Sequence, residues 1–275
     1  MISKISNKER DEIFRNLKIY GYSHIKKTIK KKNVKKLLNK VIKIHKGLSL
    51  KTTQIKGLPK RDSKDLRVYN LPEKDKTFID LLTDIQIEKI LKPLINDPYY
   101  RYLPNNLPNY IIGSSTARSS GNALDLHIDS MFPFSGNYPI SILLLFVLEE
   151  MHEKNGATIV VPGSHMSGTY TDRNLKDKKI ICAKPGDLII IDSRTWHGSL
   201  ANKTKKSRWL INSLVTQWWL KQQVNIPESV PKNIFNKLSN KQKQILGYCS
   251  IPPMSELERI NTKCGYNILK NHKGD

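Results

Sequence analysis

Hydrophobic and polar residues follow two different periods along the chain, and the change falls near residue 104. Before it, apolar residues recur every three or four positions, which is the spacing of one face of an α-helix. The first helix is expected over residues 7–18, with Asn7 as its cap and Gly21 as its end. Further helices are expected over 33–47 and 76–95, the latter broken near Thr83 and Asp84. YSHIKK predicts a short strand after the first helix, and QIKGLPKRDSKD predicts a loop.

From Pro104 onward the apolar segments are short, rich in β-branched residues and separated by Gly, Pro and Asn. They predict about seven strands: NYIIGSSTA, ALDLHID, ISILLLFVL, TIVVPGS, KIICAKP, DLIIIDS and WLINSLVTQWW. Short strands at regular spacing are typical of a sandwich, jelly roll or barrel. After Pro231, NIFNKLSNKQKQIL predicts helix, followed by a polar tail.

These elements predict one mainly β domain with flanking helices over residues 1–275. It has a helical N-terminal region (about 1–100), a β core (about 104–222) and a helical C-terminal region (about 231–262). The longest apolar run, ISILLLFVL, is far short of the ~20 residues that span a bilayer. We therefore read it as a buried strand and expect no transmembrane segment.

Charge and cysteine content narrow the functional classes. The net charge is +23, and Lys is concentrated in the first third of the chain. A Lys-rich helix face is typical of solvated surface, and neither a recognition motif nor interleaved aromatics accompany it. We therefore expect no specific nucleic-acid partner. An anionic substrate or an anionic membrane surface stays open, and the basic composition favours an anion as substrate. Oligomeric state is left open.

The three cysteines, Cys182, Cys249 and Cys264, are scattered and form no CxxC motif. This pattern suits a reducing compartment and argues against a Cys-type zinc site. The N-terminus also lacks the apolar stretch of a signal peptide. Both features predict a cytoplasmic protein.

Candidate chemistry begins with His127 and Asp129, at the end of a predicted strand. Side chains at positions i and i+2 of a strand point the same way, so both can reach one ion. One His-x-acid pair is near what chance gives for 7 His and 24 acidic residues, so the pair needs further support. Two His and one carboxylate on one face of a metal are the ligands of non-haem Fe(II) oxygenases.

The second imidazole of such a site must come from a distant strand. His197 is the best candidate, because it follows an apolar run and a turn in GDLIIIDSRTWHGS, and His165 of VPGSH competes with it. Arg208 follows on the next predicted strand. Its planar guanidinium suits bidentate capture of a carboxylate.

The segments LHID, NGATIVVPGSH, AKPGDLIIIDSRTWHGS and SRWLINSL occur in this order and resemble the phytanoyl-CoA dioxygenase family of Fe(II)/2-oxoglutarate oxygenases. YGYSHIKK and LGY also fit, and the resemblance covers about residues 12–250. It implies a double-stranded β-helix core of the jelly-roll, cupin-like type. In this core His127, Asp129 and His197 hold Fe(II), and Arg208 binds the distal carboxylate of 2-oxoglutarate. It also implies that Ser199 helps Arg208 and that His165 is structural.

Other residues keep two interpretations. Thr116, a candidate cofactor contact, precedes the HxD strand together with Arg118 and Asp125, and each can also belong to a solvated turn. Aromatic residues in β cores are usually packing, but three tryptophans can also line the pocket: Trp196, Trp218 and Trp219. Three glycines are expected to serve turns: Gly156, Gly163 and Gly186.

The resemblance implies a dioxygenase that uses Fe(II), 2-oxoglutarate and dioxygen to hydroxylate an unidentified small molecule, with succinate and CO₂ as coproducts. Asp129 stands where halogenases of this kind carry a small residue, so hydroxylation is expected and not halogenation. One alternative is a cupin-like metal enzyme without 2-oxoglutarate, but the extra His and Glu ligands are missing and Arg208 is left unexplained. The other is a non-catalytic basic binding protein, which predicts a damaged triad.

Overall fold

The computed structural model describes residues 1–48, 66–99, 107–119, 121–170, 176–252 and 254–257. The chain divides into two compact units, Met1–Tyr69 with Thr116–Ser213 and Asn70–Ser115 with Leu214–Asp275. The predicted single domain stays a prediction. Cys264 and the loop predicted over QIKGLPKRDSKD lie outside the described residues.

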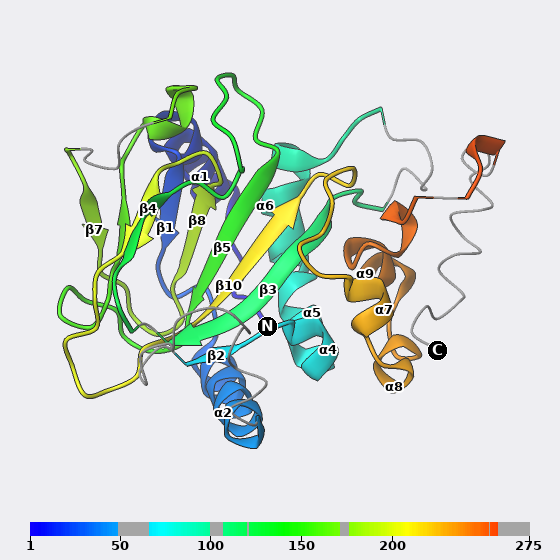
Figure 1. Ribbon diagram of the computed structural model, residues 1–275, viewed down its shortest axis with the longest axis horizontal. Helices are drawn as coiled ribbons and strands as arrows, with labels where there is room; N and C mark the ends of the chain where they lie inside the picture. The colour runs from blue at the N-terminus through cyan, green and yellow to red at the C-terminus, as the bar shows by residue number, and fades with distance from the viewer. Residues whose placement is uncertain (49–65, 100–106, 120, 171–175, 253, 258–275) are drawn as a thin grey trace, which may run out of the picture. The chain divides into compact units, whose positions relative to one another are not determined.

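Two antiparallel sheets carry the β core that the sequence predicts (Figure 1). One has the order β4-β9-β6-β7, from Leu124–His127 (β4), His197–Ser199 (β9), Thr158–Val160 (β6) and Lys179–Ile181 (β7). The other has the order β1-β8-β5-β10-β3-β2. Its strands are Tyr22–Ile25 (β1), Leu188–Asp192 (β8), Ser141–Val147 (β5), Trp209–Thr216 (β10), Ile111–Ser119 (β3) and Arg67–Val68 (β2). The boundary between the units falls within β3 and β10.

Continuous apolar runs become the buried strands of the larger sheet. Every residue of β5 and β8 is buried, and the two strands pair antiparallel with Leu144 opposite Ile190. Strand β1 pairs with the other edge of β8, so the predicted strand YSHIKK is confirmed. All seven predicted core strands are present, although several are shorter than their apolar segments. Strand β9 was not predicted, because its three residues HGS carry no periodicity.

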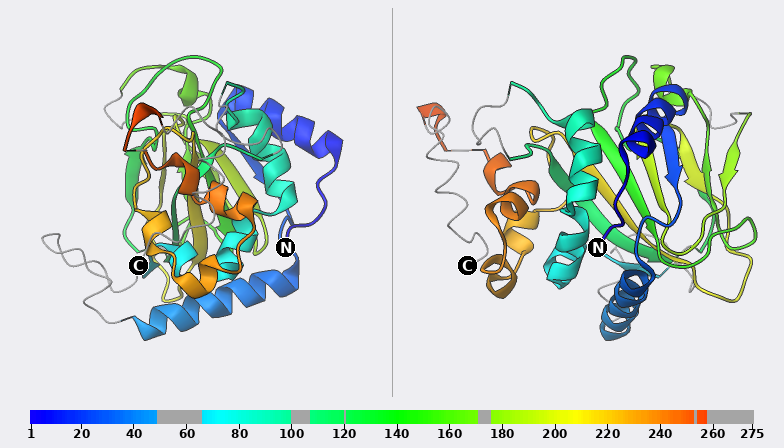
Figure 2. Two further views of the ribbon diagram at one scale, coloured as in Figure 1. Left: turned by 90° about the vertical axis from the view of Figure 1, so that its right-hand side faces the viewer. Right: turned by 180° about the vertical axis from the view of Figure 1, so that it is seen from behind.

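Two helices of the first unit, α1 (Asn7–Tyr20) and α2 (Lys31–Gly47), confirm the N-terminal predictions and lie outside the sheets (Figure 2). The predicted cap Asn7 is wrong. Ser6 caps α1, because its hydroxyl accepts from the Glu9 amide while the Glu9 carboxylate accepts from the Ser6 amide. The helix ends at Gly21, whose φ of 76° is the left-handed conformation that glycine adopts without strain.

The second unit contains short helices and the outer parts of β3 and β10. The predicted helix over 76–95 is two helices, α5 (Lys76–Leu82) and α6 (Ile85–Ile95), and Asp84 in the predicted break caps α6. The helix predicted after Pro231 is also interrupted. Its pieces are α8 (Lys232–Phe235) and α9 (Asn240–Ile245). The unit also contains α4 (Leu71–Lys74), α7 (Ile226–Ser229) and the 3₁₀ turn η2 (Tyr248–Ser250).

The predicted turn glycines are confirmed, since Gly156, Gly163 and Gly186 all have positive φ. Gly163 leads into the 3₁₀ turn η1 (Ser164–Met166). Among the described residues, no helix has both the length and the apolar character needed to cross a bilayer.

Candidate metal and 2-oxoglutarate site

The HxD motif lies at the end of β4, directly opposite the motif that contains His197. Strand β4 pairs with β9, with Leu124 opposite Ser199 and His127 opposite His197. The four residues from Leu124 to His127 therefore lie opposite the three residues from His197 to Ser199, so β4 contains one extra residue, which is a β-bulge. Without the extra residue Leu126 would face His197, so the bulge is what brings the two imidazoles together.

Gly198 allows this close approach of β4 to β9. A Cβ at Gly198 would collide with the carbonyl oxygen of Leu124 and lie 3.0 Å from that of Asp125. The glycine of the W-H-G motif is thus required by the backbone of the strand that carries the HxD motif, and not by its own φ.

We expect Gly198→Ala to force β4 away from β9, to lower the melting temperature and to weaken Ni(II) binding at least about tenfold. Overpacking of this kind typically costs about 1–3 kcal/mol of stability. Thermal melting and calorimetric Ni(II) titration measure the two effects. Gly47→Ala is the matched control, because a Cβ there meets nothing within 4 Å. Wild-type melting and metal affinity in Gly198→Ala would contradict this role.

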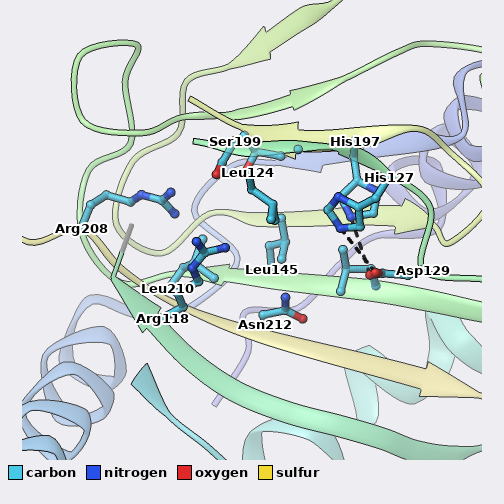
Figure 3. Close-up of a pocket in the computed structure, with 13 residues that line it drawn as sticks. Arg118, Leu124, His127, Asp129, Leu145, His197, Ser199, Arg208, Leu210 and Asn212 are labelled. Atoms are coloured by element: carbon cyan, nitrogen blue, oxygen red, sulfur yellow. Dashed lines mark ion pairs between the residues drawn. The ribbon is translucent and has the colours of Figure 1, made fainter. Parts of the chain in front are cut away.

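His127, Asp129 and His197 form one compact cluster. Their ligand atoms lie within 4.8 Å of one another, and this is the group that could hold a metal among the residues the structure describes. Each His Nε2 lies 3.6 Å from an Asp129 carboxylate oxygen, and the imidazole centroids are 4.4 Å apart (Figure 3). Asp129 is held in place by its amide, which donates to the Ser193 carbonyl at 2.8 Å.

Both imidazoles are oriented by a backbone carbonyl two residues earlier. His127 Nδ1 lies 2.8 Å from the Asp125 oxygen, and His197 Nδ1 lies 2.9 Å from the Thr195 oxygen. A carbonyl only accepts, so each Nδ1 carries the proton and each Nε2 presents its lone pair to the cluster. Burial lowers the pKa of His197, and the Asp129 carboxylate has the opposite, smaller effect. The lowered pKa favours the neutral imidazole, which is the form that binds a metal.

His165, the rival for the second imidazole, lies elsewhere. It is buried, and its Nε2 donates to the carbonyl of Lys18 at the end of α1. A Cβ on Gly21 would lie 2.7 Å from its Nδ1, so the ring packs against the turn after that helix. The structure thus brings His197 to the HxD pair and places His165 in a packing position.

A pocket of about 80 Å³ extends from the cluster toward Arg208. One buried water needs about 10–15 Å³, so the pocket has room for a small molecule. Its lining comes from both sheets: Arg118, Leu124, His127, Asp129, Leu143, Leu145, Thr158, His197, Gly198, Ser199, Arg208, Leu210 and Asn212. Figure 3 shows the triad at one end, Arg208 and Ser199 at the other, and Leu145 between them.

The far end of the pocket holds polar groups that lack a partner. Arg208 is buried; one nitrogen donates to the Gly156 carbonyl, but Nε has no hydrogen-bond partner in the described structure. The buried Ser199 hydroxyl is likewise unsatisfied within that part of the chain. Burial lowers the pKa of Arg208 to about 9, Arg118 lowers it as well, and Glu149 opposes both. An unsatisfied buried cation and hydroxyl are a site for an anion.

The remaining candidate residues do not line the pocket. Thr116 lies half-buried on β3, and Asp125 is exposed, with its carbonyl rather than its carboxylate serving the site. Trp196 packs against Leu126 and Val161 in the core. Trp218 donates to Asp97, and Trp219 is exposed.

Four residues that line the pocket were not predicted from the sequence: Asn212 and the aliphatic side chains of Leu143, Leu145 and Leu210. Arg208, Leu210 and Asn212 are spaced by two along one strand, which places them on one face. This alternation could have predicted that Asn212 faces the pocket together with Arg208. Asn212 is the one residue of β10 that is not fully buried.

A two-sheet β core with a His-Asp-His cluster facing a buried arginine defines the class of non-haem iron oxygenases with a double-stranded β-helix. The model of the phytanoyl-CoA dioxygenase (PhyH) family matches residues 17–209, which is more than half of the chain. The chain belongs to this family of Fe(II)/2-oxoglutarate-dependent dioxygenases.

The chain is also similar in sequence to curated proteins and in fold to solved structures. The dioxygenase af480 of Aspergillus fumigatus is 27% identical over 195 residues, covering 68% of this chain and 60% of that protein. The chain spans 60–64% of the length of the first curated relatives it matches. EctD from S. alaskensis, solved with 2-oxoglutarate and 5-hydroxyectoine, has a TM-score of 0.61 at 16% identity over 78% of this chain and 79% of that one. HygX from Streptomyces hygroscopicus, solved with nickel and 2-oxoglutarate, has a TM-score of 0.59 at 14% identity, and the match covers 80% of this chain and 90% of that one.

Proposed function

We propose that this protein is an Fe(II)- and 2-oxoglutarate-dependent hydroxylase of a small molecule. One observation carries the proposal: a His-Asp-His cluster and an unsatisfied Arg208–Ser199 pair lie at opposite ends of one pocket. The cluster has the donor set that suits Fe(II), and the pair suits the distal carboxylate of a dicarboxylate. The residues present therefore fit both groups.

His127, Asp129 and His197 would hold the metal through their Nε2 atoms and the carboxylate. Bound together, Fe(II) and 2-oxoglutarate would activate dioxygen, which oxidises both 2-oxoglutarate and the substrate: one oxygen atom goes into succinate, with release of CO₂, and the other converts a substrate C–H into an alcohol. Arg208 and Ser199 would fix the far end of 2-oxoglutarate, and thereby its 2-oxo acid end, near the metal. Leu145 and Leu210 form apolar walls that limit water between the two ends.

Hydroxylation is the finer part of the proposal. It rests on Asp129, whose carboxylate would bind the metal where a halide would otherwise bind. EctD was solved with a hydroxylated compound, 5-hydroxyectoine. The same fold also occurs in the epimerase SnoN and the carbocyclase SnoK, so the fold alone does not decide the reaction outcome. The substrate is a small molecule that the basic composition favours as an anion.

The two alternative functions have less support. A cupin-like enzyme without 2-oxoglutarate leaves the buried Arg208 and Ser199 without a ligand. A non-catalytic binding protein does not explain why three metal-ligand side chains cluster, or why a backbone carbonyl orients each of the two imidazoles through its Nδ1. We further propose a cytoplasmic protein with no specific nucleic-acid partner; binding of DNA or RNA that survives about 200 mM salt would contradict the latter.

Succinate formation tests the proposed function directly. Without substrate, we expect slow conversion of 2-oxoglutarate to succinate under air with Fe(II) and a reductant, and none with a chelator or without dioxygen. A panel of small acids, amino acids, phosphonates and acyl thioesters should contain compounds that accelerate it. Their products should gain one oxygen and carry no chlorine in chloride buffer. Succinate formed without iron, or a chlorinated product, would contradict the proposal.

A further inference from the structure

Arg194 is a buried cation that does not line the pocket. Its guanidinium forms a fork with the Asp192 carboxylate: Nε donates to Oδ1 at 3.0 Å, and Nη2 donates to Oδ2 at 2.7 Å. The Arg194 amide also donates to Oδ1, at 3.0 Å. The Thr195 amide donates to the Asp192 carbonyl at 2.8 Å, which makes residues 192–195 a β-turn. The ion pair therefore fixes the two central residues of this turn against its first residue.

The two carbonyls on either side of Arg194 hold two residues of the triad. The Ser193 carbonyl accepts from the amide of Asp129 at 2.8 Å. The Thr195 carbonyl accepts from Nδ1 of His197 at 2.9 Å. A change in the turn would thus move a carboxylate ligand and an imidazole ligand at the same time.

The Arg194 side chain also holds the segment that follows Asp129. Its Nη1 donates to the Gly136 carbonyl at 2.7 Å, and its guanidinium carbon lies 4.7 Å from the centroid of the Phe134 ring. A cation over an aromatic face is attracted to it. The segment 129–136 is therefore tied to the turn at its start by the Ser193 carbonyl and at its end by the Arg194 guanidinium.

We propose that Arg194 is a positioning residue for the metal site. Together with Asp192, it fixes the turn whose carbonyls hold Asp129 and His197 in place for the metal. This inference rests on the proposed function, in which the triad binds the metal. A planar guanidinium can donate to both oxygens of a carboxylate and to a third acceptor at once, whereas the ammonium of a lysine cannot form this fork.

Metal binding by the full-length protein tests the proposal without turnover. We expect Arg194→Lys to raise the calorimetric Kd of Ni(II) about tenfold, because partners that orient metal ligands typically contribute 10–100-fold to affinity. The visible absorption bands of the Co(II)-saturated protein report the geometry of the metal ligands. They should differ between Arg194→Lys and wild type, which a residue that only stabilises the fold would not cause.

The matched control is Asp187→Asn, at the other end of the same strand. Asp187 directly precedes β8 and Asp192 ends it, and their side chains are 5% and 6% exposed. Asp187 accepts from the amides of Lys27 and Lys184, and it lies 3.0 Å from Nε2 of His24. Its replacement should lower the melting temperature of the metal-free protein and leave the Ni(II) affinity and the Co(II) bands as in wild type.

A double variant covers the case in which Arg194→Lys does not fold. Removing one partner of a buried ion pair leaves an uncompensated charge, whereas removing both is often close to neutral. Asp192→Asn combined with Arg194→Met removes both charges and keeps an acceptor oxygen at residue 192 for the Arg194 amide. We expect the same loss of Ni(II) affinity and the same change in the Co(II) bands as in the lysine variant.

The outcomes separate this inference from the proposed function. If wild type does not bind Ni(II), or His197→Ala binds it like wild type, the proposed function itself fails. If His197→Ala loses the metal but the Arg194 variants keep wild-type Ni(II) affinity and Co(II) bands, only the role of Arg194 is overturned, even where their melting temperature falls. An equal loss of Ni(II) affinity in Asp187→Asn would also overturn it.

Discussion

Replacing His197 by alanine is expected to lower the affinity for Fe(II) by at least about 100-fold and to abolish turnover of 2-oxoglutarate. Loss of a group that merely orients a metal ligand typically costs 10–100-fold in affinity, and His197 would contact the metal itself. Its Nε2 lies 3.6 Å from the Asp129 carboxylate, and the centroid of its ring lies 4.4 Å from that of the His127 ring. Anaerobic calorimetry with Fe(II) measures the loss, and His127→Ala should give the same result.

The matched control is His165→Ala. This residue also follows a strand and is also buried, but it contacts the end of α1 and not the cluster. Its loss should lower the melting temperature and leave one Fe(II) site per chain with near wild-type affinity. The triad is misassigned if His165→Ala loses the metal while His197→Ala retains it.

Replacing Arg208 by alanine is expected to raise the Kd of 2-oxoglutarate by at least tenfold, with metal affinity unchanged. Truncating one partner of a buried, hydrogen-bonded charge pair costs about 2–5 kcal/mol, and each 1.4 kcal/mol is a factor of ten. Arg208→Lys should recover only part of the affinity, because a point charge cannot form two parallel hydrogen bonds. Calorimetry on the Ni(II)-loaded variants separates this effect from catalysis.

The control for Arg208 is internal to the same experiment. Ni(II) titration of Arg208→Ala should match wild type, since the triad lies at the other end of the pocket. Unchanged 2-oxoglutarate affinity in this variant would leave the buried guanidinium unexplained and remove the main argument for the cosubstrate.

The strands of the core were predictable because they are apolar on both faces. ISILLLFVL and DLIIIDS are dominated by apolar residues, which indicates burial, and they pair as β5 and β8, two interior strands of the larger sheet. Strand β9 was not predictable in this way. Its residues His197, Gly198 and Ser199 form a strand because they pair with β4 and β6, and such tertiary pairing leaves no period in three residues.

In the candidate site, too, features set by local sequence were predictable and features set by strand pairing were not. His127 is the last residue of β4 and Asp129 follows in the next turn, so their spacing is local and the sequence was enough to bring them together. The bulge in β4 is a property of two paired strands, and it decides that His127 and not Leu126 faces His197. Thr116, Arg118 and Asp125 were all selected by their position near the HxD motif, and of these three only Arg118 lines the pocket.

The central claim is that one molecule of 2-oxoglutarate bridges the metal cluster and the arginine end. Titration of 2-oxoglutarate into the wild-type protein, with and without bound Ni(II), tests it most directly. The account predicts one site per chain and an affinity at least about tenfold higher when the metal is present, because both ends of the ligand are then held. Equal affinity with and without metal, or no binding with metal bound, would contradict it.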